Sequence, residues 1–425
     1  MRRLIKYAWA NALLGEELLV TTTGAQVRII SIGGEECDGV DAPDFMDVKL
    51  EIDGKLWVGS VCCDVRSSDW FRRNNHCKGV FDSVLLYLVE EADHQVYRKS
   101  GELIPTLVPP NWLLLRSQIF RFLFGTSDMP CAKGIANISK VDMAGWIESL
   151  AFERLRDKIA RIKGWYDSTC GSWEDVCYAT FARNLGFGID SDMMEELAMR
   201  TPLALLQRVS DSQTQVEALL FGQAGVLNSQ WFKGDDYYQQ LCREYAFLAN
   251  KFSLSAMDSS SKLDFRGNVK TFPFRRIAVL AHFVKGGFRL MRSIIDTDDE
   301  QELRKLFNVE FTGYWATHSS FDKPASSVAR VISRKSVDIV IINSVVPINY
   351  YYGEYIGDFS YCEKGVRLLE SLAAEDNSIV RIFKSKGVKV PDALTSQALI
   401  QLYRNYCQTH RCEHCRIMSC ILSVK

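Results

Sequence analysis

The sharpest chemical signal in this 425-residue sequence is a group of cysteines near its C-terminal end. Cys407, Cys412 and Cys415 follow the spacing C-x4-C-x2-C, directly after a segment with helical periodicity. Soft thiolate ligands at this spacing suit zinc or an iron–sulfur cluster, so the pattern predicts a metal knuckle and leaves the metal open. The alternative is a cysteine-rich tail that binds no metal.

Such a knuckle needs a fourth ligand. Candidates nearby in the sequence are Cys420, His410 and His414. We favour a distant cysteine, Cys131 in the loop sequence Ser-Asp-Met-Pro-Cys, because a loop thiol tied to the C-terminal tail would staple distant parts of the chain together. The predicted metal ligands are Cys131, Cys407, Cys412 and Cys415.

A second set of reactive residues lies within residues 41–70, DAPDFMDVKLEIDGKLWVGSVCCDVRSSDW. Two alternating runs joined by Asp-Gly predict a β-hairpin, which brings Asp44 and Asp64 to the ends of neighbouring strands. Carboxylate oxygens are the ligands that Mg²⁺ prefers, and a bound Mg²⁺ can activate water for phosphodiester cleavage. His76, in the polar loop that follows, is the candidate general base.

The second strand of this hairpin departs from the arrangement found in metal-dependent nucleases. Those enzymes have a Glu or Asp, one spacer and a Lys on this strand, whereas this chain reads Cys62-Cys63-Asp64-Val65-Arg66. The alternative interpretation is that Asp44 is a turn or cap residue and Asp64 a surface charge at a strand end.

The densest group of basic residues in the first part of the chain follows the same hairpin. Arg66, Arg72, Arg73 and Lys78 alternate there with aromatic residues such as Trp70. Cations beside aromatic rings can hold a nucleic-acid backbone, so these four residues are the candidate nucleic-acid contacts. The alternative is an ordinary exposed loop.

Hydrophobic periodicity assigns these residues to an α+β protein. Residues 1–110 are predicted to form a mixed α/β domain with a helix over 2–14 and strands over 26–32, 47–52, 55–61 and 80–89. A second hairpin is predicted across residues 95–108. Residues 111–406 are predicted to be an α-helical region, in which 337–347 is apolar enough for a strand but has helical neighbours that favour a helix. The other helices predicted in this region cover residues 112–124, 141–162, 173–186, 192–199, 212–220, 237–251, 275–292, 299–307, 364–374 and 396–406. Loops are predicted at 264–273 and 312–324, and residues 407–425 are predicted to be the metal knuckle, packed on the helical region.

Composition narrows the cellular setting. The net charge of −1 provides no overall basic field for nucleic acid, so any nucleic-acid surface must be a local patch. No apolar run reaches the roughly 18 residues that a transmembrane helix needs, and the N-terminal segment lacks a signal-peptide pattern. We therefore expect a cytoplasmic protein without a membrane partner. Its 13 cysteines are expected to be reduced thiols.

Several stretches together resemble the uncharacterised bacterial family called domain of unknown function 2851. They include residues 41–47, Ser67-Ser68-Asp69-Trp70, residues 101–105, residues 217–225, Phe272-Pro273, Ile342-Asn343 and residues 406–415. Members of that family typically have Val-Glu-Ile-His on the second strand, which is similar to the catalytic strand of PD-(D/E)XK nucleases. The resemblance implies a nuclease-like N-terminal domain whose catalytic strand is degraded here, because Cys62 replaces the Glu. It also supports Cys131 as a ligand, by analogy with iron–sulfur-stapled nucleases.

Two functions follow as hypotheses. In the first, the chain is a nuclease-like protein that binds nucleic acid and whose metal-dependent phosphodiesterase activity is weak or lost. In the second, it is a non-enzymatic binding or scaffold protein whose helical region docks a protein partner.

Overall fold

The structure is a computed structural model that describes residues 1–15, 18–35, 42–227, 232–258, 274–285, 287–322, 324–325 and 328–423. The chain forms two compact units. The first comprises Met1–Trp146, Ile382–Val388 and Ile400–Lys425, and the second comprises Ile147–Arg381 and Lys389–Leu399. The predicted loop at 264–273, Phe272-Pro273, Cys37 and most of the acidic turn before Asp44 lie outside the described residues.

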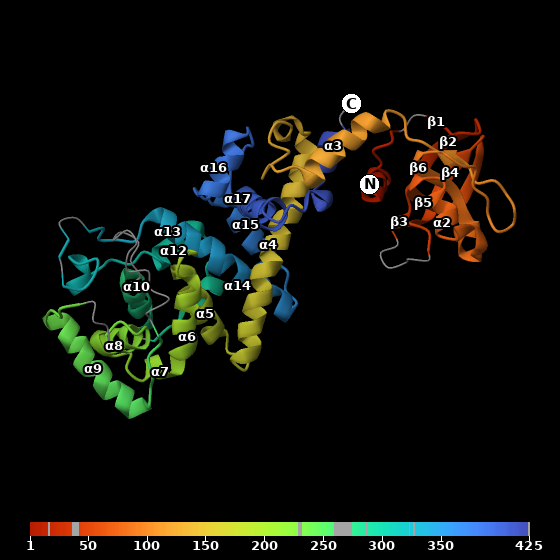
Figure 1. The fold of residues 1–425 in the computed structure, drawn as a ribbon. Coiled ribbons are helices and arrows are strands. Elements are labelled where there is room, and N and C mark those ends of the chain that lie inside the picture. The colour runs from red at the N-terminus through yellow and green to blue at the C-terminus, as the bar shows by residue number, and fades with distance from the viewer. Residues whose placement is uncertain are drawn as a thin grey trace. The chain divides into compact units, whose positions relative to one another are not determined.

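The first unit is built on a mixed sheet to which seven of the described strands belong, in the order β1-β2-β4-β5-β6-β7 with β3 paired to β4 (Figure 1). Strands β1, β2, β4 and β5 pair antiparallel, whereas β6 runs parallel to β5 and β7 parallel to β6. The strands are β1 Leu19–Val20, β2 Gln26–Ser31, β3 Gly34–Glu35, β4 Phe45–Ile52, β5 Lys55–Arg66, β6 Val84–Glu91 and β7 Thr106–Leu107.

The hairpin of β4 and β5 forms where the Asp-Gly pair predicts it. Asp53 and Gly54 both have positive φ, 49° and 77°, as a two-residue hairpin turn requires. Because β6 is parallel to β5, the chain needs a crossover, which is made by helix α2 Asp69–Arg72 and short 3₁₀ turns at Asn75–Cys77 and Gly79–Ser83. The first six residues of β6 are buried, as the apolar run over 80–89 predicts, but the strand begins only at Val84.

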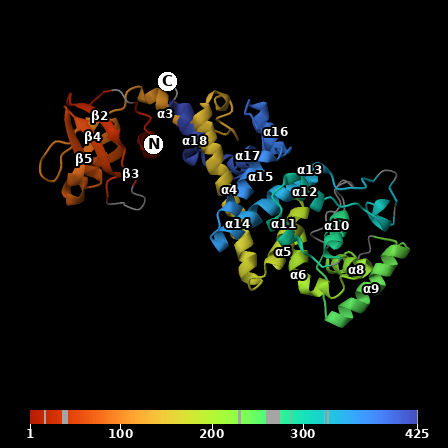
Figure 2. The same ribbon diagram turned by 180° about the vertical axis from the view of Figure 1, so that it is seen from behind.

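One face of the sheet is covered by residues from both ends of the chain. Helix α1 Arg2–Ala10, helix α3 Trp112–Phe124 and the C-terminal helix α18 Arg416–Ser423 share one hydrophobic core with the sheet. Figure 2 shows α18 beside α3, and Met418 of α18 is buried with Leu4 and Ile5 of α1. On the other face, Trp70 of α2 packs against Tyr87 of β6.

The second unit is helical. The first boundary between the units lies within α4 Lys140–Ser168, and the helices of the second unit surround a large apolar core. The helices that lie wholly in this unit are α5 Trp173–Leu185, α6 Ser191–Arg200, α7 Leu203–Gln207, α8 Gln213–Gln223, α9 Asp236–Phe252, α10 Phe274–Val284, α11 Leu290–Asp296, α12 Glu300–Leu306, α13 Arg334–Val340, α14 Val346–Ile356 and α15 Ser360–Ser371. Two further helices, α16 Ser378–Ser385 and α17 Ala393–Leu402, each cross a boundary between the two units. Two short π-helical turns are also present: Ile341–Val345 joins α13 to α14, and Tyr403–Cys407 follows α17 in the first unit.

The predicted fold class, an α+β protein with a helical C-terminal region, is confirmed. Residues 337–347 are helical, as their neighbours indicate. The second predicted hairpin is reduced to one antiparallel bridge between Tyr97 and Leu103, because β7 pairs with β6 instead. Among the described residues, no helix combines the length and the apolar character needed to cross a bilayer.

Candidate functional sites

The two predicted carboxylates lie close together, with an arginine between them. Asp44 directly precedes β4 and Asp64 lies in β5, and both are buried, with exposed fractions of 6% and 1%. The guanidinium of Arg2, from α1, places Nη2 2.7 Å from Asp44 Oδ1 and Nε 3.2 Å from Asp64 Oδ1. Its Nε also donates to the carbonyl of Cys63 at 2.8 Å. A cationic side chain therefore lies where a metal bridging the carboxylates was predicted.

Each carboxylate has further partners. Asp44 accepts a hydrogen bond from the backbone N–H of Cys63 at 2.8 Å, and the Lys6 ammonium lies 3.3 Å from it. Asp64 accepts a hydrogen bond from the hydroxyl of Tyr87 at 2.9 Å, and the guanidinium of Arg73 lies 2.8 Å from its Oδ1. Both acids are thus fixed by protein cations and donors.

Burial raises the pKa of Asp64 to about 6, and the neighbouring Arg73 and Arg2 oppose this shift without cancelling it. Its Oδ1 is within ion-pair distance of both guanidiniums but accepts no well-aligned hydrogen bond among the described residues. An incompletely hydrogen-bonded carboxylate is costly to keep ionised in a buried place. Asp64 therefore takes up a proton more readily than an exposed aspartate does.

Position 62 does not supply a third carboxylate. Cys62 and Asp64 are two residues apart on β5, so their side chains point to the same face. The Cys62 thiol is buried, and burial followed by the charge of Asp44 raises its pKa far above the ordinary range. A neutral thiol is a poor ligand for Mg²⁺, which prefers oxygen.

His76, the predicted general base, packs against an aromatic ring. It lies in the 3₁₀ turn Asn75–Cys77, with its ring centroid 5.2 Å from that of Phe71. Its Nδ1 is buried and has no hydrogen-bond partner among the described residues. The proposed role of His76 as a general base stays a prediction.

The four predicted nucleic-acid contacts lie on β5, α2 and the loop after it, and carboxylates neutralise three of them. Arg66 lies 3.1 Å from Glu91, Arg72 pairs with Asp69, and Arg73 pairs with Asp64. The ammonium of Lys78 lies 6.0 Å from the ring centroid of Phe81. The patch therefore presents exposed guanidinium edges above carboxylates, rather than unpaired positive charge.

The loop sequence Ser67-Ser68-Asp69-Trp70 has a positioning role. Trp70 is fully buried and donates from its indole Nε1 to the carbonyl of Tyr97 at 3.0 Å. Ser67, also buried, donates to the carbonyl of His94 at 2.7 Å. These contacts anchor α2 on the sheet, so the guanidinium of Arg73 reaches Asp64 from a fixed backbone.

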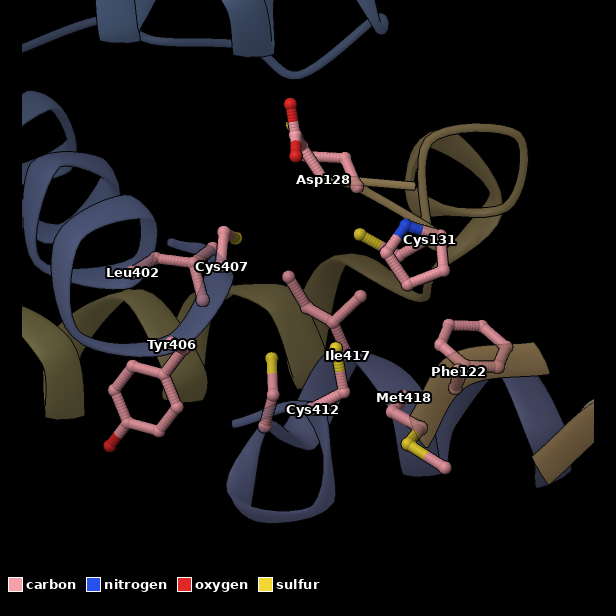
Figure 3. A pocket seen from close by; sticks show the side chains of 12 residues that line it. Phe122, Asp128, Cys131, Leu402, Tyr406, Cys407, Cys412, Ile417 and Met418 are labelled. Carbon is pink, nitrogen blue, oxygen red and sulfur yellow. The ribbon is translucent and has the colours of Figure 1, made fainter. Parts of the chain in front are cut away.

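The four predicted thiol ligands line a single cavity of about 20 Å³ in the first unit. Figure 3 shows the sulfur atoms of Cys131, Cys407 and Cys412 pointing toward the same space from different segments. Cys407 ends the π-helical turn after α17, Cys412 begins a 3₁₀ turn, and Cys415 directly precedes α18. The rest of the lining is Phe122, Asp128, Met129, Pro130, Leu402, Tyr406, Ile417 and Met418.

This cavity favours neutral thiols. Burial, followed by the charge of Cys412, raises the pKa of Cys131 to about 11, and burial raises that of Cys415 to about 12. The pKa of Cys407 is raised further, by burial and then by the other thiols. In the part of the chain that the structure describes, no three His, Cys, Asp or Glu side chains already have the geometry of a metal site.

The other candidates for the fourth ligand, Cys420, His410 and His414, do not line the cavity. The Nε2 of His414 instead lies 3.7 Å from Glu413. Cys420 is half-buried on α18. The structure thus groups Cys131 with the three tail thiols around one cavity, and metal binding by these four residues stays a prediction.

Two residues that sequence reasoning missed belong to α1. Arg2 contacts both carboxylates, and Tyr7 is buried in the core that Cys131 and Cys412 contact, where burial, followed by the charges of Cys415 and Cys412, raises the pKa of its hydroxyl. The available signal was the spacing of Arg2 and Lys6, which puts both cations on one helix face. Nothing in the sequence showed that this face covers Asp44.

Comparison with known proteins identifies the family. The family described as "Protein of unknown function (DUF2851)" matches residues 2–378, and the chain belongs to it. The match includes the acidic pair and Cys131 but ends before the three tail thiols. Neither a curated protein nor a solved structure matches the chain.

Proposed function

We propose that the first unit is a nuclease-like domain that binds nucleic-acid phosphates without cleaving them. The observation that carries this proposal is the guanidinium of Arg2, which lies between Asp44 and Asp64. A nuclease would use such a pair to hold a divalent cation. In this protein the pair holds arginines.

The chemistry of the pair supports binding over cleavage. Arg2 and Arg73 already neutralise Asp64, so a divalent cation would have to displace a fixed guanidinium. Cys62 offers a neutral thiol where a third oxygen ligand is needed. The predicted site would therefore bind Mg²⁺ weakly, and phosphodiester cleavage that depends on Mg²⁺ would be slow or absent.

The same contacts prepare two arginines for phosphate. The side chains of Arg2 and Arg73 are 38% and 37% exposed, while the carboxylates that hold them are buried. A guanidinium has five N–H donors in a rigid plane, so its outer edge remains able to donate to a phosphate. Arg66 and Arg72 on the adjoining surface, with Lys78, extend these contacts along a backbone.

We further propose that the thiol cavity holds a single zinc ion. Cys131, Cys407, Cys412 and Cys415 would be its ligands, a complete set for a closed structural site. A cavity of about 20 Å³ has room for about one water-sized sphere. That size fits one ion, whereas an iron–sulfur cluster of several iron and sulfide atoms would have to displace Ile417 or Met418. The zinc charge would stabilise thiolates that burial otherwise disfavours.

The phosphate proposal is tested by equilibrium binding of short single-stranded and duplex oligonucleotides. Contacts with phosphates release counterions, so affinity should fall steeply between about 50 and about 200 mM salt. Arg73→Gln should weaken binding and flatten the salt dependence, and the double reversal Arg72→Glu with Arg73→Glu should abolish it.

The matched control is Arg292→Gln, which removes an exposed arginine paired with Asp296 in the second unit. It should leave affinity unchanged. Absent or salt-insensitive binding in the wild type would refute the proposal. Equal weakening of binding by Arg73→Gln and by the control Arg292→Gln would also refute it.

The zinc proposal is tested by elemental analysis of protein purified without oxygen. We expect stoichiometric zinc in the wild type, and its loss together with lower thermal stability in Cys412→Ser, because structural zinc contributes folding free energy. Cys170→Ser, which changes an exposed thiol of the second unit, is the control and should retain the metal. Stoichiometric iron with a visible absorption band would show that the site holds an iron–sulfur cluster and not zinc. The absence of both metals would remove the site.

A second candidate function, docking of a protein partner, is favoured by one feature of the second unit. An open pocket of about 470 Å³ is lined by Phe152, Tyr350, Phe359, Cys362, Glu363, Val366 and Arg367. Phe359 is 68% exposed at its rim. A partner that purified wild-type protein binds and Phe359→Ser does not would support this function, whereas equal binding by both would argue against the pocket.

A further inference from the structure

Helix α1 contacts the acidic pair and also the turn that carries Cys412. Its Arg2 and Lys6 are four residues apart and pair with Asp44. Its Arg3 and Tyr7, also four residues apart, lie on the adjacent face and meet the tail. Arg3 pairs with Glu413, which lies in the 3₁₀ turn between Cys412 and Cys415.

The hydroxyl of Tyr7 has an unusual environment. It is buried and has no hydrogen-bond partner among the described residues. The side chain packs in the same core that Cys131 and Cys412 contact. A buried hydroxyl without a partner costs free energy comparable to a lost hydrogen bond. A neutral thiol is a weak acceptor, whereas a metal-bound thiolate is a charged one that would satisfy this donor.

We infer that α1 couples the thiol site to the acidic pair: Tyr7 donates a hydrogen bond to a metal-bound thiolate of Cys412 or Cys415, which fixes α1 and so holds Arg2 between the carboxylates. This inference rests on the proposed zinc site. Arg3 and Glu413 provide a second tie between the same helix and turn. Loss of the metal would leave Tyr7 unpaired and loosen the helix that positions Arg2.

The first readout is zinc affinity, measured by competition with a chromophoric chelator. Removing a hydrogen bond to a metal ligand typically weakens metal binding by roughly 10- to 100-fold, and we expect this for Tyr7→Phe. The control is Tyr97→Phe, which removes a tyrosine hydroxyl of the first unit that donates to Gln95 and does not line the thiol cavity. Its zinc affinity should match that of the wild type.

The second readout is amide hydrogen exchange, which does not depend on nucleic-acid binding. Chelation of zinc should speed exchange in α1 and at the backbone N–H of Cys63, which donates a hydrogen bond to Asp44. Tyr7→Phe saturated with zinc should show faster exchange in α1 than the saturated wild type.

These outcomes separate the inference from the proposals on which it rests. The wild type could contain stoichiometric zinc while Tyr7→Phe binds zinc with unchanged affinity and hydrogen exchange in α1 does not change with zinc. That result would overturn the coupling but would support the metal site. Absence of zinc from the wild type would overturn both. Oligonucleotide binding enters neither readout, so failure of the phosphate proposal would be seen separately.

Discussion

The carboxylate of Asp64 illustrates how a single residue can carry both stability and function. Burial raises its pKa to about 6, from an ordinary value of 3.8, although two guanidiniums lie beside it. The folded protein therefore binds this proton more tightly than the unfolded chain does. The stability that Asp64 contributes is fully present below about pH 4 and is lost as pH rises through about 6.

The pH dependence of stability should therefore change in Asp64→Asn. Between about pH 4 and about pH 6 the wild type should lose stability relative to the variant, by up to about 3 kcal/mol. Thermal unfolding of both proteins at several pH values measures this difference. A difference that stays constant with pH would contradict the assignment.

The matched control for this prediction is Asp192→Asn. The hydrogen bond from Arg183 lowers the pKa of Asp192, so its stability contribution is present above the unfolded pKa and lost at lower pH. In this control the wild type should gain stability relative to the variant as pH rises. The two differences should therefore have opposite signs.

At the residue scale, the sequence indicated which residues could form a site better than it indicated which residues contact them. It predicted the hairpin that brings Asp44 and Asp64 to neighbouring strands, because the Asp-Gly turn is a local signal, and the role of these residues stays a prediction. It could not identify Arg2 as their partner. That contact joins residues 42 positions apart, and it depends on how α1 packs on the sheet.

At the scale of elements, the packing of α8 against α9 depends on one glycine. A Cβ at Gly222 would lie 2.1 Å from a ring atom of Tyr245, in a core where neither helix can withdraw freely. Overpacking of this kind typically costs about 1–3 kcal/mol.

Gly222→Ala should lower the thermal unfolding midpoint of the second unit, by about 2–4 °C for each kcal/mol lost. The control is Gly164→Ala in α4, where a Cβ would meet nothing within 4 Å. This substitution should instead stabilise the helix by about 0.5–1 kcal/mol. Equal effects of the two changes would show that the close approach to Tyr245 is unimportant.

Element limits were predicted best where hydrophobic periodicity is long. The predicted helix over 112–124 coincides with α3, and helices were expected within α4, α5, α6, α8 and α9. Short helices such as α7 and α16 were missed, because few residues give a weak period. The π-helical turn ending at Cys407 was also missed. Such a turn shifts the phase of the helix and changes the face on which its last residue lies.

At the scale of the whole molecule, both ends of the chain belong to the same unit. Met418 near the C-terminus is buried in the core that contains Leu4 and Ile5 of α1. The sequence predicted domains at 1–110, 111–406 and 407–425, with the tail on the helical region. It contained no signal for the tail's packing on α3 and the sheet core, because apolar patterns show which residues are buried and not which partner buries them.

Truncation after Arg411 should therefore destabilise the first unit, to whose core the removed helix α18 contributes. Removal of α18 would expose the apolar side chains of α1 and α3 that Met418 covers. We expect faster hydrogen exchange in α1, α3 and β4, and unchanged exchange in α8 and α9. Met418→Ala should act in the same direction with a smaller effect. Unchanged exchange in α1 after truncation would contradict this account of the core.

The central claim is that the acidic pair holds arginine in place of a metal. The most direct test is titration of the zinc-loaded protein with Mn²⁺, in which electron paramagnetic resonance measures the concentration of free Mn²⁺ at each step. The account predicts no stoichiometric Mn²⁺ site in the wild type, and the appearance of Mn²⁺ binding in Arg2→Gln that a further Asp44→Asn change abolishes. Stoichiometric Mn²⁺ in the wild type, lost on Asp44→Asn, would show that the pair is a metal site and contradict the claim.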